Sequence, residues 1–241
     1  MKIIVTNNYK EMSQTAGNII ASQVILKPNS VLGLATGSTP LGMYQHLIEL
    51  YNNGVVDFHD IITFNLDEYH RISPNSPQSY YYYMMENFFN HINIQKSNVH
   101  IPDGQSDDID RECINYEYKI ESAGGIDLQI LGIGPNGHIG FNESSDHFQA
   151  GTHLADLTKE TIKANSRFFD SMDEVPKTAI TMGIKSIMLA KKIVLLANGK
   201  NKADIISKTL KGHITPNVPA SILQLHPDVT VILDKEAASK L

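Results

Sequence analysis

The chain has 241 residues, of which 41% are hydrophobic and 19% are charged, so it has an ordinary globular composition and is long enough to bury a large core. Its net charge of −6 and its dispersed lysines and arginines argue against a nucleic-acid partner, which requires clustered positive charge. A single cysteine, Cys113, excludes an intrachain disulfide, and no secretory signal or long apolar run is present, so we expect a cytoplasmic protein without a membrane partner.

Short apolar runs alternate with longer amphipathic stretches, which is typical of an α/β fold with an open, mostly parallel, twisted sheet and helices on both faces, as in Rossmann-like proteins. The runs are too continuously apolar for half-exposed strands, which favours strands buried on both sides. We predict strands at Ile3–Val5, Val31–Leu34, Ile61–Asn65, Ile126–Ile133, Ala179–Met182, Ile193–Ala197 and Val229–Leu233.

Capping signals place the helices between these strands. One helix is predicted over Tyr9–Leu26, with Asn8 as its cap. The next begins at Thr39 and Pro40, with Thr39 as the N-cap, and Gly54 ends it. Further helices are predicted at about residues 78–90, 107–122 and 200–210.

We detect no internal repeat and no linker, so residues 1–241 are predicted to form a single α/β domain. A polar region at about residues 144–173 interrupts the alternation of strands and helices. We interpret this region as a candidate mobile lid inserted in that domain.

Three loops follow strands at the edge of the sheet where ligands bind in open α/β folds. The first contains Thr36, Gly37, Ser38 and Thr39. Its hydroxyl groups, its glycine and the N-terminus of the next helix favour an anion such as a phosphate. The segment lacks the ending of a Walker loop, and a capped turn without a ligand is the alternative interpretation.

The second loop contains two adjacent carboxylates, Asp67 and Glu68, after the strand Ile61–Asn65. An aspartate at this position can act as a general base if it contacts an acidified C–H group. The alternative is a pair of solvated loop carboxylates without a catalytic role.

The third loop has four glycines between Gly132 and Gly140, which let the backbone turn closely around a small ligand. His138 titrates near physiological pH, and Glu143 is placed to orient its imidazole. A purely structural histidine is the alternative. The glycine pattern is a poor dinucleotide fingerprint because His138 occupies a position that needs tight helix packing. The histidines are scattered, so we expect no metal and no cofactor.

These three loops together suit aldose–ketose chemistry on a phosphorylated sugar. Six segments of the chain, in this order, also resemble the signatures of the glucosamine-6-phosphate deaminases. They are Leu34-Ala-Thr-Gly-Ser-Thr-Pro40, Phe64-Asn-Leu-Asp-Glu-Tyr69, Pro77-Gln-Ser-Tyr80, Gly137-His-Ile-Gly-Phe-Asn-Glu143, Ala164-Asn-Ser-Arg-Phe-Phe169 and Leu223-Gln-Leu-His-Pro227. The first segment is shared with the 6-phosphogluconolactonases, whereas the second and fourth are specific to the deaminases.

The resemblance implies conversion of glucosamine 6-phosphate to fructose 6-phosphate and ammonia without a cofactor. Asp67 would move the proton between C2 and C1, and His138, paired with Glu143, would open the sugar ring. Asn136 stands where some members of the family have an aspartate linked to this pair. The residues that would bind the phosphate are Thr36, Gly37, Ser38, Thr39, Arg167 and Lys202.

The chain departs from allosteric members of the family at the activator site. The positions that hold basic side chains in those members are His153 and Ala155 here, and the C-terminal tail is shorter. We therefore expect an enzyme without allosteric activation that is a monomer or a small homo-oligomer. The alternatives are a 6-phosphogluconolactonase-type hydrolase and a sugar-phosphate sensor module.

Overall fold

In the computed structural model, which describes residues 1–241 but only the backbone of Phe168, the strands form two sheets. The large sheet has seven parallel strands in the order β1-β10-β9-β6-β2-β3-β5. They are β1 (Lys2–Thr6), β2 (Val31–Leu34), β3 (Ile62–Asn65), β5 (Val99–His100), β6 (Leu128–Leu131), β9 (Lys192–Ala197) and β10 (Val229–Asp234). The small sheet is antiparallel, in the order β4 (Asp67–Tyr69), β8 (Thr178–Thr181) and β7 (His153–Asp156).

The helices largely follow the predicted positions. They are α1 (Tyr9–Leu26), α2 (Ser38–Asn52), α3 (Tyr80–Asn87), α4 (Ile109–Ser122), α5 (Lys159–Asn165), α6 (Ile184–Met188) and α7 (Ala203–Lys211), with 3-10 turns η1 (Phe89–His91), η2 (Lys96–Asn98), η3 (Ser166–Phe168), η4 (Met172–Glu174), η5 (Lys200–Lys202) and η6 (Pro219–Leu225). Asn8 caps α1, as predicted, because its side chain accepts a hydrogen bond from the Glu11 amide at 2.9 Å.

The prediction of Thr39 as the N-cap of α2 is wrong. The helix begins at Ser38, and its N-cap is Gly37, whose φ of 100° suits a glycine. The Thr39 hydroxyl instead donates to Asn198 Oδ1 at 3.0 Å, beyond the end of β9. This bond ties the end of β2 to the end of β9 across the sheet.

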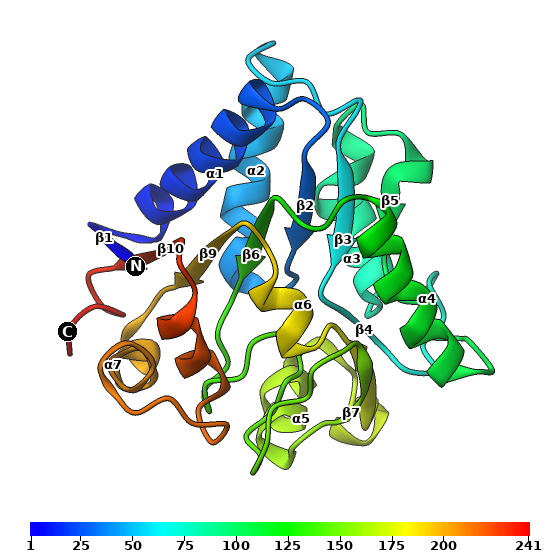
Figure 1. The fold of residues 1–241 in the computed structure, drawn as a ribbon, viewed down its shortest axis with the longest axis vertical. Coiled ribbons are helices and arrows are strands. Elements are labelled where there is room, and N and C mark those ends of the chain that lie inside the picture. The colour runs from blue at the N-terminus through cyan, green and yellow to red at the C-terminus, as the bar shows by residue number, and fades with distance from the viewer.

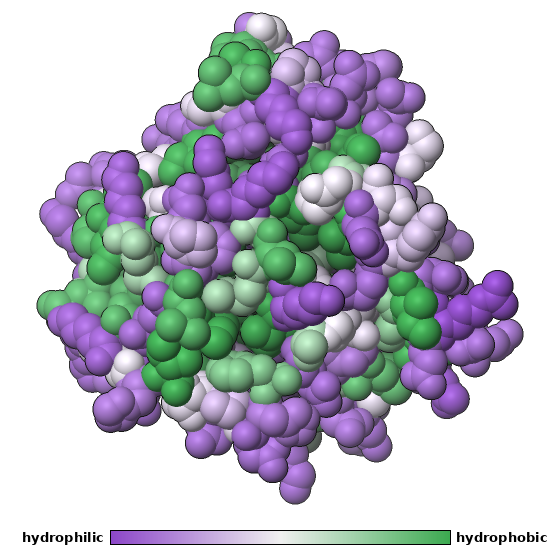
Figure 2. Space-filling model, in the orientation of Figure 1, coloured by the Kyte–Doolittle hydropathy of each residue, from purple (hydrophilic) through white to green (hydrophobic). Residues whose placement is uncertain are grey.

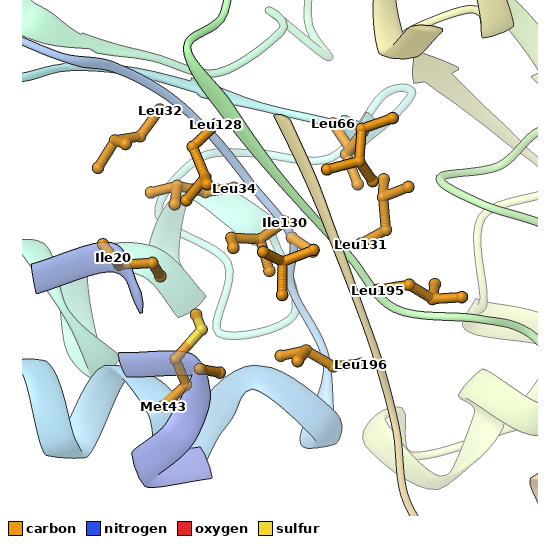
Figure 3. Packing of buried hydrophobic residues seen from close by; sticks show 14 of the residues in the cluster. Ile20, Leu32, Leu34, Met43, Leu66, Leu128, Ile130, Leu131, Leu195 and Leu196 are labelled. Atoms are coloured by element: carbon orange, nitrogen blue, oxygen red, sulfur yellow. The ribbon is translucent and has the colours of Figure 1, made fainter. Parts of the chain in front are cut away.

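The core lies on both faces of the large sheet. Figure 3 shows Ile20 of α1 and Met43 of α2 packed toward Leu34 of β2 and Ile130 of β6. On the opposite face, the ring of Tyr116 in α4 meets Phe64 of β3 edge-on, with ring centroids 5.7 Å apart. Helices therefore cover both faces, and the predicted α/β architecture is confirmed.

The predicted strand Ala179–Met182 is present as β8, but it lies in the small sheet, where it pairs antiparallel with β4 and β7. The strands β4, β5 and β7 were not predicted, because two to four residues are too few for a recognisable pattern. The small sheet has its own apolar cluster, formed by Tyr69, Phe141, Ala155, Leu157 and Ala179.

In Figure 1, β2 runs toward the lower end of the molecule, where α5 and β7 lie. Residues 144–173, the candidate lid, contain strand β7 of the small sheet and helix α5. On the face shown in Figure 2, hydrophobic residues appear near the centre and also at the top and the left edge, with hydrophilic residues between them. Within the described part of the chain, every helix is too short or too polar to cross a membrane.

Candidate active site

The carboxyl ends of four parallel strands lead into the loops that contain the predicted site residues. The loop after β2 contains Thr36–Thr39, β3 leads directly into β4 with Asp67, and the loop after β6 contains His138. Beyond β9, Lys202 Nζ donates to the carbonyl oxygen of Ile133 at 2.6 Å, which joins this fourth loop to the third. The structure therefore gathers the predicted residues at one edge of the sheet, where α/β enzymes bind their ligands.

His138 and Glu143 form the pair that the sequence predicts. His138 Nδ1 lies 3.2 Å from Glu143 Oε2, and the two side chains are 15% and 9% exposed. An ionised Glu143 can only accept a hydrogen bond, so Nδ1 carries the proton and donates it, which selects the tautomer with a lone pair on Nε2. This arrangement leaves His138 Nε2 as the atom that can exchange protons with a substrate.

Glu143 is held ionised by its neighbours. Burial by itself raises the pKa of this carboxyl, but hydrogen bonds from His138, Thr161 and Asn136 outweigh burial and lower it to about 2. Asn136 Nδ2 donates to Glu143 Oε2 at 2.6 Å, and Thr161 Oγ1 donates to Glu143 Oε1. Both oxygens of the carboxylate are therefore occupied, and its charge faces the imidazole.

Asn136 has two contacts that fix its amide. Its Oδ1 accepts a hydrogen bond from the backbone amide of His138 at 3.1 Å, while its Nδ2 donates to Glu143. An ionised aspartate at this position would repel Glu143 instead of donating to it. The asparagine thus supports the ionised form of Glu143 without adding a charge to the site.

Asp67 is buried at the start of β4, with 6% of its surface exposed. Burial, followed by the charge of Glu68, raises the pKa of Asp67 to about 8. No hydrogen bond to its carboxylate is formed by the side chains and backbone that the structure describes. Its Oδ2 faces Gly140, where a β-carbon would lie 3.5 Å away, so Asp67 reaches the loop that contains His138. A poorly solvated, unpaired carboxylate is a strong base once ionised.

Glu68 is also buried, at 3% exposure, so the interpretation of solvated loop carboxylates is wrong. Its carboxylate accepts backbone hydrogen bonds from Tyr69, Tyr80 and Tyr81 at 2.8, 2.9 and 2.9 Å. Burial raises the pKa of Glu68, and these amides act in the opposite direction. Glu68 therefore anchors the N-terminus of α3 to β4, and only Asp67 is free to meet a substrate.

The predicted anion loop lies at the N-terminus of α2. Gly37, its N-cap, accepts a hydrogen bond at its carbonyl from the Tyr83 hydroxyl at 2.7 Å. The Ser38 side chain is exposed, and Arg167 Nη2 lies 3.5 Å from Ser38 Oγ. The structure thus places Arg167, from the segment 144–173, beside the loop as predicted. An N-terminal turn with exposed hydroxyls and a guanidinium is suited to a phosphate.

Lys202 lies near the same loop. Burial, followed by the positive charge of Arg167, lowers the pKa of Lys202 to about 8. Two positively charged side chains held close enough together to affect each other's protonation favour an anionic ligand. No three histidine, cysteine, aspartate or glutamate side chains group into a metal site among the described residues.

Two contacts in the site were not predicted. Thr161 of α5 donates to Glu143, and Thr181 of β8 accepts the backbone amide of Phe141 at 3.0 Å. Thr181 is the neighbour of Asp67 in the small sheet, so it fixes the loop of the His–Glu pair beside Asp67. A lone threonine in a polar stretch has no local signal for such a role, because its partner lies far away in the sequence.

The chain was compared with known proteins. Residues 7–232 match the family model described as glucosamine-6-phosphate isomerases/6-phosphogluconolactonase. A glucosamine-6-phosphate deaminase of Thermoanaerobacter pseudethanolicus is 64% identical over 99% of this chain and 94% of its own length. One of Halothermothrix orenii is 60% identical over the whole of both chains.

Solved structures agree in fold. A protein described as a monomeric glucosamine-6-phosphate deaminase superposes with a TM-score of 0.98, at 48% identity over the whole of both chains. A 6-phosphogluconolactonase from Leishmania guyanensis superposes with a TM-score of 0.74 at 21% identity, over all of this chain and 98% of its own. At that identity the second likeness shows a shared fold only.

Proposed function

Since this chain belongs to the family of glucosamine-6-phosphate isomerases and 6-phosphogluconolactonases, we propose that the site described above converts glucosamine 6-phosphate and water to fructose 6-phosphate and ammonia. The chain is an enzyme that deaminates glucosamine 6-phosphate, the activity named for relatives that are 60% and 64% identical over nearly all of its length. The observation that supports the assignment of residues is the unpaired, buried carboxylate of Asp67 near the hydrogen-bonded pair of His138 and the ionised Glu143.

The phosphate group binds at the N-terminus of α2. The loop Thr36–Thr39 at the start of α2 offers backbone amides and the exposed Ser38 hydroxyl to the anion, and Arg167 and Lys202 supply two positive charges. Arg167 contacts two phosphate oxygens, while Lys202 acts as a point charge. This end of the sugar is thereby fixed, which sets the distance from C6 to the reacting carbons.

His138 opens the ring. Its Nε2 takes the proton of the C1 hydroxyl and returns a proton to the ring oxygen, so that the C1–O5 bond breaks and C1 becomes an aldehyde. Glu143 keeps Nδ1 protonated and stabilises the imidazolium that forms between the two transfers.

Asp67 then transfers the C2 proton. It removes the proton from C2, next to the aldehyde, while the aldehyde oxygen takes a proton from the C2 ammonium group, which gives an enolamine. Asp67 then returns its proton to C1. The product is an imine at C2, to which water adds before ammonia leaves. The high pKa of Asp67, about 8, makes it a stronger base than an ordinary aspartate.

The lactonase alternative is disfavoured. Ester hydrolysis needs no base that removes a proton from carbon. This site, however, contains a buried carboxylate that suits this task, Asp67, just after β3. The lactonases also share only 17–23% identity with this chain, compared with 48% for the solved deaminase.

We also propose that residues 144–173 close over the bound sugar as a lid within one domain, since Arg167 reaches the phosphate loop from that segment. We expect the protein to be a monomer, as is the solved relative at 48% identity.

An ammonia-release assay tests the proposed function. Glucosamine 6-phosphate should yield equal amounts of ammonia and fructose 6-phosphate, and unphosphorylated glucosamine should react far more slowly because it lacks the group that Arg167 and Lys202 bind. Hydrolysis of 6-phosphogluconolactone, without ammonia release from the amino sugar, would overturn the proposal.

A further inference from the structure

Thr161 donates a hydrogen bond to Glu143 across a gap of 18 residues, from helix α5 to the loop after β6. Its side chain is 2% exposed, so the hydroxyl has no access to bulk water. The bond is made to Oε1, whereas His138 and Asn136 both occupy Oε2. Thr161 is therefore the group that holds the other end of this carboxylate.

The direction of the bond is fixed by the neighbours of Thr161. Thr158, the N-cap of α5, accepts the amide of Thr161 at 3.2 Å and donates its own hydroxyl to Thr161 Oγ1 at 3.1 Å. The hydroxyl of Thr161 thus already accepts one bond, and its proton points to Glu143. When hydroxyl groups donate to one another in the same direction, each hydrogen bond strengthens the next. The last bond of this series is donated by Thr161 to the charged carboxylate of Glu143.

A carboxylate that is held at one oxygen alone rotates easily, because the terminal torsion of glutamate has a broad energy minimum. A second donor on Oε1 removes this freedom and keeps Oε2 turned to the imidazole. The orientation of Glu143 in turn sets the tautomer of His138, since the hydrogen bond on Nδ1 decides where the lone pair lies.

We propose that Thr161 is a positioning residue for ring opening: it fixes the Glu143 carboxylate from helix α5 and so keeps a lone pair on His138 Nε2. This inference rests on the proposed function of the His138–Glu143 pair. It adds a residue outside the loops that the sequence singles out.

The same short stretch of chain contacts two other parts of the site. Asn165, one turn after Thr161, donates to the hydroxyl of Tyr69 in β4 at 2.9 Å, next to the base Asp67. Arg167 follows and lies beside Ser38 of the phosphate loop. Helix α5 and η3 therefore connect the phosphate site to the ring-opening pair within one short, continuous stretch of chain.

The charged surroundings of Glu143 are simple. His138 is the one titratable group that contacts it among the described residues, and Asn136 and Thr161 are neutral. Asp67 approaches from β4 on the other side of Gly140. The charged residues of α5 itself, Lys159, Glu160 and Lys163, are all exposed to solvent. Loss of the Thr161 hydroxyl should therefore change mainly the protonation of the His138 ring nitrogens.

The first test is kinetic and uses Thr161→Val, which keeps the shape but removes the hydroxyl. We expect kcat for glucosamine 6-phosphate to fall about tenfold, the effect of one lost hydrogen bond to a charge, with KM within about twofold. Thr161→Ser restores the hydroxyl and should recover most of kcat. Should Thr161→Val fail to fold, Thr161→Ala removes the same hydroxyl and is judged in the same way.

The second test needs no substrate. The ¹⁵N shifts of His138 in the full chain at fixed neutral pH report which ring nitrogen holds the proton. The wild type and Thr161→Ser should show the proton on Nδ1, and Thr161→Val should show a mixture of tautomers. This signal does not depend on turnover, so it tests the inference separately from the proposed function. Failure of the proposed function would appear instead as a wild-type protein that releases no ammonia.

Two controls separate positioning from stability. Thr209→Val removes a buried hydroxyl in α7 that has no hydrogen-bond partner within the described structure, and it should leave kcat and the His138 signal unchanged. Thr158→Ala weakens the cap of α5 but keeps the Thr161 hydroxyl, so it should lower the melting temperature more than kcat. The inference is overturned if Thr161→Val keeps the wild-type tautomer and kcat, or if Thr161→Ser is as impaired as Thr161→Val.

Discussion

The imidazole of His138 lies directly against the α-carbon of Gly134. A β-carbon added to Gly134 would come within 2.2 Å of His138 Nε2 and 2.4 Å of Nδ1. Gly134 also donates its amide to the carbonyl oxygen of His138 at 2.9 Å, so backbone and ring are held together. The glycine is required here because the ring occupies the space of a side chain.

Gly134→Ala should displace the imidazole and lower kcat by about 100-fold, the usual effect of moving a catalytic group by roughly 1 Å. The matched control is Gly132→Ala in the same loop, where an added β-carbon meets no atom within 4 Å. Steady-state assays of both variants check this prediction. Equal activity in the two variants would show that the position of the ring is not critical.

Asp67→Asn should abolish ammonia release and leave the affinity for the sugar phosphate within about tenfold, because the carboxylate acts on a proton and not on the phosphate. The exposed Asp60→Asn is the control for loss of a carboxylate. Retention of more than about a tenth of the wild-type kcat by Asp67→Asn would exclude Asp67 as the base. Glu68 is unsuitable as a control, since it anchors α3.

The same variant should be more stable than the wild type at alkaline pH. Burial raises the pKa of Asp67 from 3.8 to about 8, so the folded protein retains a proton that the unfolded chain releases between these values. The stabilisation from this proton is complete below the lower value and is lost as the pH rises to the upper one. Asparagine has no such dependence, so the Tm advantage of Asp67→Asn should grow from about pH 4 to about pH 8 and then stay constant, as thermal melts can measure.

The pH dependence of kcat/KM should be a narrow bell centred near pH 8. Activity of the free enzyme requires Asp67 without its proton and Lys202 with its charge, and the pKa of each is about 8. Lys202→Arg keeps its charge at high pH and should move only the alkaline limb upward. If the alkaline limb does not move in this variant, then a group other than Lys202 causes the loss of activity at high pH.

Arg167→Ala should raise KM about tenfold or more and change kcat by less than about threefold, because its contact with the phosphate is the same in the ground and transition states. Lys163→Ala, an exposed cation on α5, is the matched control for charge. The comparison is made with glucosamine 6-phosphate at low and moderate salt. An unchanged KM in Arg167→Ala would place the phosphate elsewhere.

N-acetylglucosamine 6-phosphate should not activate the enzyme, and the kinetics should be hyperbolic. Burial lowers the pKa of His153, so this histidine is mostly neutral at pH 7, and Ala155 is buried and uncharged. Neither can hold a dianionic phosphate, which needs compensating charge. Substrate titrations with and without the effector check this, and a sigmoidal curve that becomes hyperbolic with the effector would contradict it.

Much of the fold and most of the site follow from the sequence. The strands β2, β3, β6, β9 and β10 lie in mostly apolar runs of the sequence. Such runs can be recognised locally, because a strand that is buried on both faces needs apolar residues along most of its length. Asp67, His138 and Glu143 were predicted because each follows such a strand, at the edge where a parallel sheet brings its loops together.

The tertiary structure alone decided the contacts between segments that are distant in the chain. Asp67 and Glu68 are adjacent in sequence, yet one is unpaired and the other accepts three backbone amides, because successive side chains of a strand point to opposite faces. The roles of Thr161 and Thr181 likewise arise only when α5 and β8 fold against the His–Glu loop. A hydroxyl group has the same local signature at the surface as in a site, and burial beside a charge is what gives it a function.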